Sequence, residues 1–131
     1  MIRAFFHSRV RSFRHAFEGV WYVLRTQKNA WIHLAIMFLV ILLAAWLRLS
    51  LLDWSILVIA MGMVWMAEFL NTSIEAIVDL VSPQRHPLAK ISKDVGAAAV
   101  LITALIAVIV GFLMMGPPLW ARIQTLLFPI R

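Results

Sequence analysis

The stretch Met66-Ala-Glu-Phe-Leu-Asn-Thr-Ser-Ile-Glu-Ala-Ile-Val-Asp79 places three carboxylates and an amide at the end of a long apolar run. On a helix, where successive residues are about 100° apart, the polar residues share one face; they are Glu68, Asn71, Glu75 and Asp79. Glu68 and Glu75 are separated by about 10 Å along the helix axis, which is too far for both to hold one ion. The two glutamates are therefore expected to have different roles.

The rest of the sequence is strongly apolar. Of its 131 residues, 63% are hydrophobic and 14% are charged, which is more apolar surface than a soluble domain of this size buries. The apolar residues form three blocks of about the length that crosses a bilayer, at residues 29–47, 51–81 and 95–115. We therefore predict an all-α membrane protein with three transmembrane helices in a single membrane domain, residues 1–131.

The second block is longer than a bilayer requires. From Trp54 to Val81 a helix is about 42 Å long, against a hydrocarbon thickness of about 30 Å, so its last turns are expected to project into the cytoplasm. Glu68 then lies at acyl-chain depth, whereas Glu75 and Asp79 lie at the water boundary. A carboxylate inside the membrane is costly and usually marks function. The alternative is a structural glutamate that packs between helices.

The segments that flank the blocks give the remaining elements. In residues 1–28 the apolar side chains recur every three or four positions, which predicts an amphipathic helix on the membrane surface. This helix either only anchors the protein or also closes over an active site. Residues 82–94 are expected to form a cytoplasmic loop, after which Lys93 and Asp94 begin the third transmembrane helix. Gly116-Pro-Pro118 is expected to end that helix, leaving residues 116–131 as an interfacial tail.

The distribution of basic residues predicts the orientation. Most of the 12 lysines and arginines precede the first block or lie between the second and third. This side, with the N-terminus, is expected to face the cytoplasm from the inner (plasma) membrane. The net charge of +6 does not indicate nucleic acid, because the basic residues flank membrane spans and no nucleic-acid-binding motif is present. Lipid headgroups and a polyphosphate are the expected partners.

This arrangement suits phosphoryl transfer between a soluble donor and a membrane-embedded alcohol. Glu68 is the candidate general base for a lipid hydroxyl, Glu75 the candidate ligand of a Mg²⁺ that bridges nucleotide phosphates, and Lys93 the candidate neutralising charge. The sequence contains neither a P-loop motif nor a kinase glycine-rich loop, so the nucleotide site is of neither standard type. Two rival interpretations are a small oligomeric transporter, in which Glu68 binds a proton or cation, and a structural membrane subunit.

Three segments carry a family resemblance. Residues 68–79, His86-Pro-Leu-Ala-Lys90 and Lys93-Asp-Val-Gly-Ala-Ala-Ala-Val100 resemble the bacterial integral-membrane diacylglycerol kinase and undecaprenol kinase family, within a match over about residues 11–111. The resemblance implies a homotrimeric helix bundle that phosphorylates a lipid alcohol, undecaprenol or diacylglycerol, with Mg²⁺ and ATP. It implies that Glu68 is the catalytic base and Glu75 a metal ligand. The implied active-site or nucleotide-contacting positions are Asn71, Asp79, His86, Lys93 and Asp94.

One position departs from the family pattern. The entry to the first transmembrane helix usually carries a second metal-binding glutamate, and the matching residue here is Gln27. An amide oxygen can coordinate Mg²⁺ but brings no charge. The motifs Arg11-Ser-Phe13, Thr26-x-x-Asn29 and His86-Pro-Leu-Ala-Lys90 resemble the undecaprenol-type members more than the diacylglycerol-type ones. The lipid stays open, because chain selectivity depends on the shape of apolar helix faces.

Overall fold

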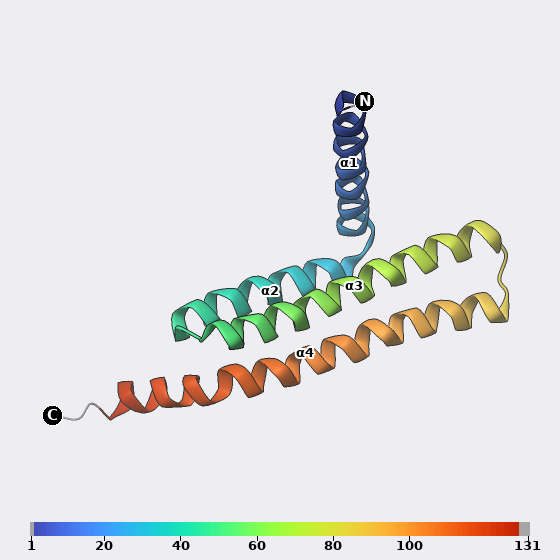
Figure 1. Cartoon of the computed structure of the whole chain (residues 1–131). Coiled ribbons are helices and arrows are strands. Elements are labelled where there is room, and N and C mark those ends of the chain that lie inside the picture. The colour runs from blue at the N-terminus through green and yellow to red at the C-terminus, as the bar shows by residue number, and fades with distance from the viewer. Residues whose placement is uncertain (1, 129–131) are drawn as a thin grey trace.

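The chain forms four helices, of which three lie side by side. The computed structural model describes residues 2–128, with the backbone alone for residues 2–8. The helices are α1 (Ile2–Thr26), α2 (Lys28–Leu47), α3 (Leu51–Val81) and α4 (Pro87–Leu127), and the described residues contain no strand. Helices α2, α3 and α4 are each long and apolar enough to cross a membrane, and α1 projects away from them (Figure 1). The predicted all-α class with an N-terminal helix and three spans is confirmed.

A tight turn joins α2 to α3 and fixes where α3 begins. Arg48 adopts a left-handed conformation with φ of 54°, and its N–H bonds the carbonyls of the last turn of α2. Ser50 then caps α3, since its hydroxyl accepts from the N–H of Asp53 and the Asp53 carboxylate accepts from the N–H of Ser50. The 31 residues of α3 span about 46 Å, so α3 is longer than the bilayer core.

Both predicted limits of the third long helix were wrong. Helix α4 begins at Pro87 and not at Lys93, because the His86 ring accepts the N–H of Leu88 as an N-cap and a proline at the first helical position leaves no donor unsatisfied. The helix also continues through Pro117 and Pro118 to Leu127. Prolines inside a helix are tolerated in membrane segments. The chain stays helical there because backbone groups released by unwinding would find no water to hydrogen-bond. Gly116 therefore does not end this helix, and residues 116–127 are helical.

Helix α1 has two different faces. Phe13, Phe17 and Trp21 recur every four residues and are exposed, so they form an apolar stripe along the helix. On the polar side the Arg14 guanidinium donates to the Glu18 carboxylate at 2.8 Å. The pKa of Glu18 is lowered, most strongly by its hydrogen bond with His15 and next by its hydrogen bond with Arg14. The amphipathic pattern predicted for residues 1–28 thus falls on one continuous helix that ends at Thr26.

Helix α4 packs mainly on α3 and much less on α2. The two helices approach closely where α4 carries Gly96, which is buried. A Cβ atom at Gly96 would overlap the Asn71 side-chain oxygen on α3. This close contact lies beside the polar face of α3, so the packing of α4 positions that face.

Candidate active site

Glu68 is the most buried carboxylate of the polar face. Its side chain is 2% exposed, and its backbone carbonyl accepts the hydroxyl of Thr72 at 2.8 Å. His33 and Glu75 are the ionisable groups near enough to act on its charge. Val64 lies one helical turn before Glu68 and lines an apolar cavity between the helices. The structure thus confirms the predicted burial of Glu68 and sets its carboxylate near one end of an apolar space.

Glu75 is held by two amides from different parts of the chain. The Gln27 side-chain nitrogen donates to one carboxylate oxygen at 2.9 Å, and the Asn71 side-chain nitrogen donates to the other at 3.1 Å. Gln27 reaches this point because it is the extended residue between α1 and α2, where the chain turns from one helix into the next. Asn71 and Glu75 lie one turn apart on α3. We call these three residues the Glu75 cluster.

The Glu75 cluster has the donors that Mg²⁺ prefers. Among the described residues no group of three or more His, Cys, Asp or Glu side chains could hold a metal ion. The cluster instead combines one carboxylate with two amides, and the Asn71 side-chain oxygen is buried without a hydrogen-bond partner. Mg²⁺ usually takes one or two carboxylates and completes its shell with water and substrate phosphates. A carboxylate and an amide oxygen are ligand types that fit Mg²⁺, although both Glu75 oxygens here accept amide N–H groups.

A polar cavity of about 660 Å³ lies where α3 ends and α4 begins. Asp79 of α3 and Lys93 of α4 line it and form an ion pair of 2.5 Å. His86 and two further basic residues, Arg85 and Lys90, also line this cavity. Its size and its excess of positive charge suit a polyphosphate.

One predicted site residue lies apart from this cavity wall. Asp94 accepts from Lys90 at 2.6 Å on the exposed surface of α4 and does not line the cavity. Apart from Glu68, the other predicted residues divide between the two groups just described. Gln27, Asn71 and Glu75 form the Glu75 cluster, while Asp79, His86 and Lys93 line the polar cavity one turn further along α3. The roles of these residues stay predictions.

Comparison with known proteins assigns the chain to a family. Residues 14–115 match the family described as "Prokaryotic diacylglycerol kinase". The chain belongs to the prokaryotic diacylglycerol kinase family. This membership makes it a lipid kinase, a transferase that phosphorylates an alcohol, as predicted, and does not favour the transporter. The family match ends at residue 115, so the last part of α4 lies beyond it.

Individual members of the prokaryotic diacylglycerol kinase family carry two different names. The undecaprenol kinase of Bacillus subtilis (strain 168) is 39% identical over 109 residues, which cover 83% of this chain and 89% of the relative. The diacylglycerol kinase of Synechocystis sp. is 44% identical over 109 residues, which cover 82% of this chain and 62% of the relative. The diacylglycerol kinase of Escherichia coli (strain K12) is 38% identical over 71 residues, covering 54% and 58%.

Two residues of the polar cavity were not singled out from the sequence. Arg85 was counted only for membrane orientation and Lys90 only for orientation and as part of a family motif, yet both line the cavity with Lys93. The signal was present, because a lipid kinase needs positive charge beside a phosphate donor and both lie within the segment 82–94. The turn at residues 82–86 brings Arg85 to the end of α3, which the pattern of charges alone did not predict.

The close contact at Gly96 yields a first prediction. We expect Gly96→Ala to lower the thermal stability of the purified protein and reduce its activity, because the new methyl group overlaps the Asn71 side-chain oxygen and displaces the side chain that donates to Glu75. Overpacking of this kind costs about 1–3 kcal/mol. Gly62→Ala is the matched control, since a Cβ there meets nothing within 4 Å. Equal melting temperatures for the two variants would contradict the close approach of α3 and α4.

Proposed function

We propose that this lipid kinase transfers the γ-phosphoryl group of Mg·ATP to the hydroxyl of undecaprenol or diacylglycerol at the cytoplasmic face of the inner membrane. The observation that carries the proposal is the position of Glu68. Its buried carboxylate lies between an apolar cavity on one side and the Glu75 cluster and polar cavity on the other. This order along α3 suits a reaction between a lipid and a charged soluble molecule.

The proposed reaction proceeds by proton transfer and in-line displacement. Glu68 accepts the proton of the lipid hydroxyl, whose oxygen attacks the γ-phosphorus. The new O–P bond forms as the bond from phosphorus to the β–γ bridging oxygen breaks, and ADP leaves. Lys93 neutralises negative charge on the phosphates, while Asp79 fixes the position of its ammonium group.

Glu75 would hold Mg²⁺ through its carboxylate, and Gln27 would add its amide oxygen as a second ligand once that amide turns over. When bound, the ion screens the charge of the nucleotide phosphates. The amides now donate to both oxygens of Glu75, so they keep the carboxylate oriented. Asn71 and His86 are the remaining predicted contacts to the nucleotide side of the site, and Asp94 would act through Lys90.

We also propose that the enzyme is a homotrimer with its N-terminus in the cytoplasm. The long helices support an oligomer, because each candidate span buries only a small part of its apolar surface within one chain. Phe38 of α2 and Leu105 of α4 are examples of large side chains that stay exposed. Lipid or a second subunit must cover such faces.

Phosphate transfer to a lipid panel tests the proposed function. The purified protein is incubated with γ-labelled ATP, Mg²⁺ and vesicles that contain either undecaprenol or diacylglycerol. Label in a lipid phosphomonoester is the expected result, and the larger kcat/KM identifies the substrate. Proton-coupled flux without a labelled lipid would select the transporter instead.

Gln27→Glu gives a further prediction at the Glu75 cluster. Gln27 contacts Glu75 directly, so the substitution replaces an amide donor by a second carboxylate. Two neighbouring carboxylates repel each other unless a cation lies between them, and ligand charge is a main control of affinity for hard cations. We expect the Mg²⁺ concentration for half-maximal activity to fall by about tenfold. An unchanged Mg²⁺ titration, or a loss of both affinity and turnover, would show that Gln27 is not a ligand position.

A further inference from the structure

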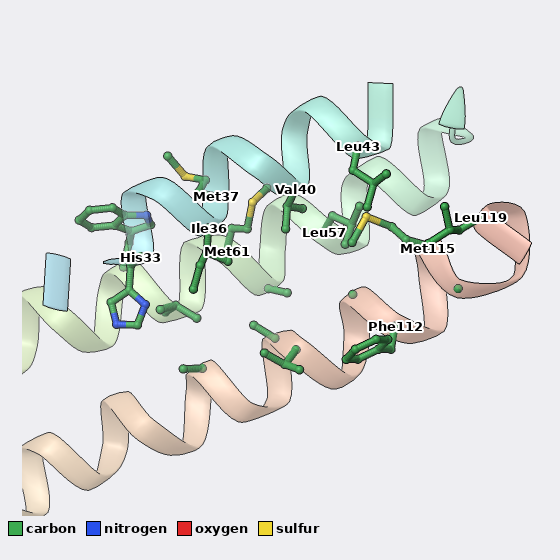
Figure 2. Close-up of a pocket in the computed structure, with 18 residues that line it drawn as sticks. His33, Ile36, Met37, Val40, Leu43, Leu57, Met61, Phe112, Met115 and Leu119 are labelled. Carbon is green, nitrogen blue, oxygen red and sulfur yellow. The ribbon is translucent and has the colours of Figure 1, made fainter. Parts of the chain in front are cut away.

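An apolar cavity of about 310 Å³ lies between α2, α3 and α4. Figure 2 shows His33 at one end of this cavity and Met115 and Leu119 at the other. Val64 and Trp65 line it one turn before Glu68, so the end with His33 is the end near the buried carboxylate. The cavity thus connects the candidate catalytic group with the opposite end of the long helices.

The far end of the cavity is built by a part of the chain beyond the family match. We call residues 116–127 the α4 extension. This extension continues α4 past the turn between α2 and α3 (Figure 1). Gly116 and Leu119 from the extension line the cavity together with Leu43 of α2. The family match ends at residue 115, so these wall residues are an addition to the matched region.

A cation–π contact fastens the α4 extension to α2. The Arg122 guanidinium lies 5.7 Å from the centre of the Trp46 ring, at the end of α2. Such contacts are attractive at exposed sites and stronger where water is excluded. The extension is therefore held beside α2 by an interaction that a single substitution can remove.

We propose that the apolar cavity holds the hydrocarbon chain of the lipid alcohol, and that the α4 extension closes its outer end and so limits the length of chain that fits. This inference rests on the proposed lipid kinase function. The chemistry of the wall supports this occupant, because His33 is its only ionisable residue among the described lining side chains. A chain that lies along the cavity directs its hydroxyl end towards Glu68.

The dimensions make chain length the property to measure. On α4 the cavity wall runs from Ala104 to Leu119, which is about 22 Å along the helix axis. A chain that fits this length buries all its methylene groups, and each buried methylene group strengthens binding. A longer chain meets Leu119 and must bend out between the helices. Activity should therefore rise with chain length and then fall.

Monoacylglycerols of increasing chain length, in mixed micelles with labelled ATP, test the inference. The wild-type enzyme is expected to lose kcat/KM for the longest chains, and a chain ended after Met115 is expected to gain about tenfold on those lipids while its KM for ATP stays within about twofold. An identical length profile for both proteins would overturn the inference and leave the kinase function intact. Absence of lipid phosphate with wild-type protein on undecaprenol and diacylglycerol as well would instead refute the proposed function.

Point variants keep the test valid if the shortened chain fails to fold. Arg122→Ala should shift the length profile in the same direction as the truncation, whereas Arg122→Lys, which keeps a cation over Trp46, should not.

Ala107→Phe fills the cavity and should raise the lipid KM about tenfold. Ala35→Phe is its matched control, because Ala35 is exposed on α2 and does not line the cavity. Equal lipid KM values for the two phenylalanine variants would count against the cavity as the chain site.

Photolabelling distinguishes the lipid from another occupant. A monoacylglycerol with a diazirine at the end of its chain is bound to the full-length enzyme, irradiated, and the labelled peptides are identified by mass spectrometry. Label on residues 112–122 is the expected result. Label confined to residues outside the far wall of the cavity, or a crosslink from a photoreactive residue at Leu119 to a second copy of this chain, would overturn the inference.

Discussion

Glu68→Gln abolishes lipid phosphorylation and leaves ATP affinity within about twofold of wild type. The amide has nearly the same shape but cannot accept the proton of the lipid hydroxyl, and loss of a general base lowers turnover by about 10²–10⁴-fold. ATP binding is expected to persist because Glu68 is about 10 Å along α3 from Glu75 and the proposed nucleotide side. Steady-state kinetics with varied ATP and lipid separate the two effects.

Glu18→Gln is the matched control for this change. It makes the same substitution on the exposed face of α1, away from the buried carboxylate. The control should keep wild-type turnover. If Glu68→Gln retains more than about half of wild-type turnover, then Glu68 is not the base.

Glu75→Gln raises the Mg²⁺ requirement and weakens nucleotide binding together. The substitution removes the one carboxylate charge of the Glu75 cluster and replaces one of its two accepting oxygens by an NH2 group, so one of the Gln27 and Asn71 amides must turn over to accept it. We expect apparent Mg²⁺ affinity to fall by about 10–100-fold, as happens when groups of a metal site are altered. A kinetic titration of Mg²⁺ at fixed ATP measures the change.

The control at this position keeps the charge. Glu75→Asp retains a carboxylate on a shorter side chain and should lose much less Mg²⁺ affinity than Glu75→Gln. An unchanged Mg²⁺ dependence in Glu75→Gln would remove Glu75 from the metal site. Recovery of that variant at high Mg²⁺ would support the assignment, because only the affinity, and not the base, has been altered.

Helical periodicity predicted the polar face of α3 correctly. Asn71 and Glu75 lie one turn apart and share a hydrogen bond, and Glu68 is buried as its depth along the apolar run indicated. These features follow from the local geometry of one helix, which a sequence specifies directly. The same reasoning predicted three spans, and the structure has three helices that are long and apolar enough to cross a membrane.

Helical periodicity does not predict contacts between segments that are distant in the sequence. Gln27 and Glu75 are brought together by the break between α1 and α2, and only the family resemblance linked them beforehand. Lys93 was expected beside the site and pairs with Asp79, whereas its neighbour Asp94 faces Lys90 on the surface. Which of two adjacent residues turns inwards depends on how α4 packs on α3.

The limits of α4 were mispredicted for one physical reason. Residues 82–94 were assigned to a loop and Pro117-Pro118 was expected to end the helix, but Pro87 is the first residue of α4 and the other two prolines lie within it. Position in the helix decides which effect prevails, because a first-turn proline has no backbone bond to lose. The α4 extension, and with it the far wall of the apolar cavity, followed only from the structure.

Parallel measurement of ADP and lipid phosphate tests the central claim most directly. Wild-type protein in vesicles that contain the preferred lipid alcohol is given Mg·ATP, and both products are quantified in the same reaction. Our account predicts one ADP for each lipid phosphomonoester, with both products lost in Glu68→Gln. Formation of ADP without lipid phosphate, or undiminished lipid phosphate in that variant, would contradict it.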